Sequence, residues 1–91
     1  MPSVNNTVAF QVALTTTATP QQLPSNALQL GGTLKASTGN SAAISISPTP
    51  GVSATSGYVL EGGDEVLFGG NNTDQLYVVG TSADVISFLG N

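Results

Sequence analysis

The chain has 91 residues and a formal net charge of −4, with one basic residue, five acidic residues and no His, Cys or Trp. Because His and Cys most often carry proton transfer, thiol chemistry and transition-metal binding near neutral pH, we expect no enzymatic activity, no cofactor and no metal site. One basic residue also argues against nucleic-acid binding, which depends on neutralising phosphates.

The small size and the low charge predict one domain that works in contact with other protein surfaces. A chain of this length buries only about 60–65% of its unfolded surface, and no disulfide can add stability. Only 7% of the residues are charged, against about 25% in average soluble domains. Since interface cores are depleted in charge, we expect a homo-oligomer (a trimer or a dimer) or a partner-bound chain.

Hydropathy along the chain predicts no membrane association. No stretch approaches the roughly 18 consecutive apolar residues of a transmembrane helix. The first residues, MPSVNNTVAFQVAL, have no basic segment before an apolar one, so they do not resemble a signal peptide. We therefore expect synthesis in a cytoplasm.

The first predicted element is a strand over residues 7–17, TVAFQVALTTT. Apolar and polar or small side chains alternate there, which is typical of a strand with one buried face. The expected buried face consists of Val8, Phe10, Val12 and Leu14. Residues 20–26, PQQLPSN, predict a loop because two prolines remove backbone donors.

Residues 27–37, ALQLGGTLKAS, predict a second strand that Gly31 and Gly32 interrupt. A glycine pair inside a strand marks a bulge, a bend or a close backbone approach. We expect Leu28 and Leu30 to share one face of this strand. Leu34 and Ala36 should continue that face after the glycines.

A turn at residues 38–40 precedes a third predicted strand over residues 41–48, SAAISISP. Ile44 and Ile46 are expected to point inward, with Ser45 and Ser47 outward. Residues 51–57 are small and polar, which predicts a loop with at most one short edge strand.

The second half predicts short strands at residues 58–60 and 65–68, joined by the acidic turn at 61–64 as a hairpin. A core strand is predicted over 75–80 and a last strand over 85–89. In the last strand Ile86 and Phe88 should face one way. Val85, Ser87 and Leu89 should face the other.

About seven short strands separated by turn signals predict an all-β fold, an antiparallel β-sandwich or barrel. We expect a single β domain over residues 1–91, with residues 1–6 as a flexible N-terminal arm. The candidate core or interface residues are Val8, Phe10, Val12, Leu14, Phe68, Tyr77 and Phe88.

Three patterns have a functional and a structural interpretation. The acidic residues at 61–65 could bind calcium, but a solvated turn explains them better because EF-hand spacing is absent. Residues 69–76, GGNNTDQL, loosely match a calcium β-roll repeat, which needs several tandem copies, and we find one. The five aromatic side chains could form a carbohydrate platform, although a small core needs their volume.

Four segments together resemble small virion proteins of tailed bacteriophages over residues 8–89: TTTATPQQLPSN, LQLGGTLKAS, SGYVLEGGDEVLF and DQLYVVGTSADVISFLGN. The similarity includes a hairpin pattern on Gly57, Leu60, Gly63 and Val66, and it departs from that pattern at Gly62, where Pro is expected. In size and strand pattern the chain looks like capsid decoration, or cement, proteins.

The resemblance implies a virion protein, made in a host bacterial cytoplasm, that binds the outer surface of the head and stabilises the shell. The implied partner is the major capsid protein. With only six charged residues in the chain, we expect that contact to use apolar and backbone groups. A tail or fibre component, a carbohydrate-binding adhesion module and a secreted calcium β-roll fragment are the alternatives.

Overall fold

The computed structural model describes residues 7–53 and 56–91, which form eight strands in two antiparallel sheets. The predicted N-terminal arm, residues 1–6, lies outside the described residues. The strands are β1 (Val8–Ala13), β2 (Gln21–Gln22), β3 (Gly32–Ala36), β4 (Ile44–Ser47), β5 (Tyr58–Leu60), β6 (Glu65–Phe68), β7 (Tyr77–Val79) and β8 (Val85–Gly90). A short 3₁₀ helix, η1 (Thr73–Gln75), precedes β7.

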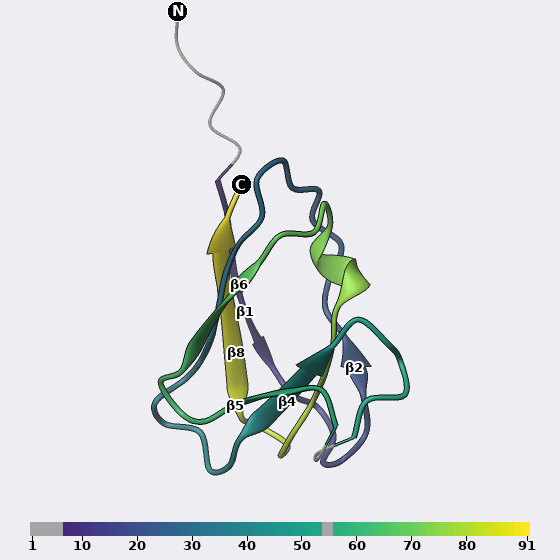
Figure 1. Cartoon of the computed structure of the whole chain (residues 1–91). Helices are drawn as coiled ribbons and strands as arrows, with labels where there is room; N and C mark the ends of the chain where they lie inside the picture. The colour runs from purple at the N-terminus through teal and green to yellow at the C-terminus, as the bar shows by residue number, and fades with distance from the viewer. Residues whose placement is uncertain (1–6, 54–55) are drawn as a thin grey trace, which may run out of the picture.

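The two sheets form a β-sandwich that stays open rather than closing into a barrel, so the all-β prediction is confirmed (Figure 1). Sheet A has the strand order β1-β8-β3-β6, and sheet B has the order β2-β7-β4-β5. β1, β8 and β6 lie on one side of the sandwich, with β2 and β4 on the other (Figure 1). The last strand is therefore central to sheet A.

The core lies between the sheets and follows the alternation of the strands. Leu34 on β3 and Ile86 and Phe88 on β8 are buried, and Ile44 and Leu60 face them from sheet B. Phe10 on β1 is only partly buried and stacks on Phe88, with the ring centroids 5.5 Å apart. The inward faces predicted for β4 and β8 are thus found.

Leu30 is exposed, which contradicts its predicted place beside the buried Leu28. The residue after it, Gly31, has a φ of +87°, so the chain turns out of the strand and alternation cannot continue through it. A Cβ on Gly31 would collide with the carbonyl oxygen of Phe68, which is the close backbone approach that the glycine pair predicted. The strand therefore starts at Gly32 instead of residue 27. In the first part of the predicted strand, Ala27 forms an isolated bridge to Asn72.

The predicted hairpin between residues 58–60 and 65–68 is wrong. β5 pairs with β4 in sheet B, whereas β6 pairs with β3 in sheet A. The turn between them carries the chain from one sheet to the other, held by a hydrogen bond from Gly63 N–H to the carbonyl oxygen of Ala36 (2.8 Å). Turn signals indicate that the chain changes direction, but not which sheet receives the next strand.

Two further predictions fail. The predicted loop at 20–26 contains β2, whose two residues pair with β7, and it buries Leu23. Ser45 has the predicted outward position in the alternation but is 2% exposed, beside the equally buried Val79. At the centre of sheet B, the outward side chains are therefore covered by other parts of the protein and scarcely contact solvent.

We expect Phe88→Ala to lower the free energy of unfolding by about 3–5 kcal/mol, the usual cost for a buried Phe. Phe10→Ala should cost clearly less, because its ring lies partly in solvent before the change. Urea denaturation followed by circular dichroism measures both. An equal loss of unfolding free energy for the two variants would show that the Phe10 ring is as fully buried as the Phe88 ring.

Gly31→Ala should be destabilising by about 1–3 kcal/mol or more, because a strained backbone conformation costs that much before any collision. Gly51→Ala is the matched control, since a Cβ added there would meet no atom within 4 Å and its φ is not positive. Thermal melts of the two variants should differ clearly. If the melting temperature of Gly31→Ala equals or exceeds that of Gly51→Ala, the close backbone approach between Gly31 and Phe68 is contradicted.

Candidate interaction surface

The outward face of sheet A carries a row of small and apolar side chains. The strand register places Ala9, Leu89, Thr33 and Leu67 side by side across β1, β8, β3 and β6. Leu67 is 83% exposed and Leu89 is 60% exposed. Leu30, 79% exposed, lies beside Leu67. We call Ala9, Leu30, Thr33, Leu67 and Leu89 the leucine face.

Two shallow hollows lie on the leucine face. One of about 320 Å³ is lined by Leu30, Thr33 and Leu67 together with backbone around them. The other, of about 260 Å³, includes Thr33 and Leu89. Exposed leucines that border hollows are more typical of a protein-binding surface than of a solvent face, because large apolar side chains on an isolated domain are usually scattered.

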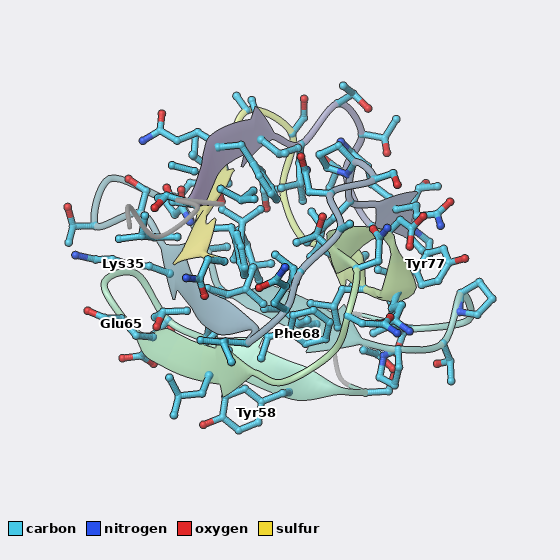
Figure 2. The ribbon with its side chains drawn as sticks, turned by 90° about the horizontal axis from the view of Figure 1, so that it is seen from above. Lys35, Tyr58, Glu65, Phe68 and Tyr77 are labelled. Carbon is cyan, nitrogen blue, oxygen red and sulfur yellow. The ribbon has the colours of Figure 1, made fainter. Side chains whose placement is uncertain are left out.

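A polar row borders the leucine face on the same side of sheet A. It consists of Gln11, Ser87, Lys35 and Glu65, which the register places on successive strands. Lys35, the one basic side chain of the protein, lies directly opposite Glu65, and the two lie side by side in Figure 2. These two charges offset each other, so the face has little net charge.

The candidate residues from the sequence lie on the other side of sheet A or in sheet B. Leu14 and Phe88 are buried. The residues partly buried against the core are Val8, Phe10, Val12 and Phe68. Tyr77 is partly exposed on sheet B. The three exposed leucines were not among these candidates. For two of them, Leu67 in EVLF and Leu89 in VISFL, the adjacent apolar residues predict a strand with two apolar faces.

The aromatic side chains do not form a shared platform. The register places Tyr58 opposite Ile46 and Tyr77 opposite Ser47, so the two rings lie on opposite faces of sheet B. Figure 2 shows them on different sides of the molecule, with Phe68 between the layers. Phe68 and Tyr58 border a cleft of about 240 Å³ at the open edge between β5 and β6. This is smaller than the roughly 300–1,000 Å³ of most small-molecule sites.

The acidic side chains do not gather into a metal site. Within residues 7–53 and 56–91, no group of three or more acidic side chains could hold a metal ion. In the acidic turn, the Asp64 carboxylate accepts a hydrogen bond from Glu61 N–H (3.0 Å) and so stabilises the turn. Residues 72–75 form a capped 3₁₀ turn, and Asn72 also accepts from Asn26 N–H (3.0 Å). The side chains named here accept hydrogen bonds from the protein backbone, so they stabilise these turns.

Asp84 is a buried carboxylate that holds two loops together. It accepts hydrogen bonds from Ser41 N–H (2.8 Å), the Ser41 hydroxyl (3.1 Å) and Ala42 N–H (3.1 Å). These bonds, that from the Ser41 N–H most of all, hold the pKa of Asp84 below its ordinary value of 3.8, although burial acts in the opposite direction. Next to it, Asn40 accepts from Val85 N–H (2.7 Å) and donates to the Val85 carbonyl (3.0 Å). The start of β8 is thereby fixed.

Among the described residues, no helix has the length and hydropathy needed to cross a membrane. Comparison of the chain with family models, with curated proteins and with solved structures gave no match. The function is therefore argued from the residues and their geometry.

We expect the Asp84→Asn variant to have a lower free energy of unfolding than the wild type at pH 7. This difference should become smaller as the pH falls. A pKa lowered by folding contributes stability that is complete above the unfolded pKa and is lost as the pH falls through the folded pKa. The wild type should be more stable at pH 7 and converge on the variant in strong acid. Thermal melts between about pH 2 and pH 7 measure this. A pH-independent difference would contradict it.

Asp74→Asn is the control for that experiment. The Asp74 side chain accepts no hydrogen bond from the described part of the chain. A surface substitution of this kind changes stability by about 0.5 kcal/mol or less.

Proposed function

We propose that this protein is a non-catalytic virion structural protein, a head decoration protein that binds the outer capsid surface through the leucine face and reinforces the shell. The observation that carries the proposal is the leucine face, whose three exposed leucines lie on or beside a sheet face with little net charge. Such a surface is unfavourable in water and is stabilised when another protein covers it.

The resemblance in strand and turn patterns over residues 8–89 supports the assignment to a virion. Five acidic residues and one basic residue also leave little capacity for a salt-bridge network with a partner. Binding energy would then come from apolar burial and backbone contacts. The proposed reinforcement follows if one copy contacts neighbouring shell subunits, because separating those subunits would expose the buried area again.

The first experiment measures binding to shells assembled in the absence of this protein. Full burial of a Leu side chain contributes about 1.5–3 kcal/mol, so a Leu67→Ser/Leu89→Ser variant should bind at least about tenfold more weakly. Co-sedimentation with purified shells measures the affinity. Binding of the wild type should persist at raised salt, because ionic screening acts on charges and scarcely on apolar burial.

Val59→Ser is the matched control, since Val59 is an exposed apolar residue on the outward face of sheet B. It should bind shells like the wild type. Unchanged binding by the double Leu variant would show that the leucine face is not the contact. Failure of the wild type to bind shells, together with binding to tail structures or glycans, would support one of the alternatives. Loss of binding in moderate salt would show an electrostatic contact.

A further inference from the structure

We propose that β1 is a self-association edge: two copies of the chain pair their β1 strands antiparallel across a two-fold axis, which joins two A sheets into one eight-stranded sheet. The inference concerns the chain alone and does not depend on capsid binding. It rests on how β1 differs from the other three edge strands.

β1 is an edge strand with free backbone groups. Its ladder partner is β8, and no other backbone hydrogen bond to Val8–Ala13 occurs within the described residues. In an antiparallel pair alternate residues direct their N–H and C=O groups away from the partner. Half of the β1 backbone groups therefore point outward, in register for another strand.

The inward side chains of β1 are incompletely covered. Val8, Phe10 and Val12 pack against the core but remain partly exposed. The equivalent residues of the neighbouring strand β8, Ile86 and Phe88, are 0% and 2% exposed. The remaining exposure thus lies along the outer edge of β1, and a strand added there would cover it.

The other edge strands have features that discourage pairing. β2 has only two residues and lies between Pro20 and Pro24. β5 has three residues, and β6 has four and begins with a charged residue. Short length, proline and charge are the usual protections of an edge. β1 has six residues and none of these protections, and no charged side chain precedes Lys35 in the chain.

The second copy is favoured over an unrelated strand because β1 is self-complementary. In a two-fold pair that keeps both cores on one side, opposite residues must share a face. Pairing Phe10 with Phe10 of the second copy also pairs Val8 with Val12, so the half-exposed apolar residues cover each other. Outside, Ala9 lies opposite Gln11, and no like charges meet.

A contact limited to the six residues of β1 is shorter than the roughly 20–30 residues a side of a standard interface, so we expect a micromolar dimer. Sedimentation velocity of the whole chain, without shells, should show a dimer at about 100 µM that dissociates at about 1 µM. A monomer at the higher concentration would overturn the proposal.

The decisive variant is Ala9→Glu/Gln11→Glu. Both positions are exposed on β1, and the pairing sets the new carboxylates directly opposite those of the second copy. The dimer Kd should rise by about tenfold or more. Thr16→Glu/Thr19→Glu adds the same charge in the exposed segment after β1 and should dimerise like the wild type. Equal Kd values for the two double variants would overturn the proposal.

Amide hydrogen exchange of the wild type tests the same edge without any substitution. As the concentration rises, alternate amides of β1 should gain protection, while the amides of β5 and β6 should not. Protection gained at β5 or β6 instead of β1 would assign self-association to a different edge and overturn the proposal.

Discussion

The pairing of β8 between β1 and β3 is the interaction on which sheet A depends. Val8 lies opposite Gly90, so strands from the two ends of the described chain are neighbours. Without β8, β1 would have no ladder partner and β3 would be left with β6 alone. No two neighbours in sheet A are consecutive in the chain, so this sheet cannot assemble from local hairpins and its pairings must close long loops. The hydrogen bonds of Asn40 and Asp84 fix where β8 begins and so set its register.

The same pairing creates the leucine face. Once the inward residues of β8 are buried, alternation forces Leu89 outward, and the β3–β6 register places Leu67 in the same row. Gly31 then turns Leu30 toward that row instead of toward the core. The exposed leucines are thus consequences of the core packing, and replacing them should leave the fold intact.

Alternation predicted the sandwich, the inward residues of β4 and β8, and the bounds of β6. It failed where neighbours distant in the chain decide the outcome. The two prolines at residues 20 and 24 predicted a loop, yet β2 forms between them because β7 supplies a pairing partner. A local turn signal could not place β5 and β6 in different sheets. The leucine face was missed because two consecutive apolar residues indicate a strand buried on both sides as readily as a binding face.

The β1 edge and the leucine face are geometrically linked. Pairing that keeps both cores on one side of the joined sheet also places both leucine faces on its other side. Two copies would then present twice the apolar area in one surface. Binding at one leucine face would raise the effective concentration of the second near its target, so a weak dimer could hold a shell more tightly than one copy. A weak edge contact suits this arrangement, because the free chain stays largely monomeric until the partner surface concentrates it.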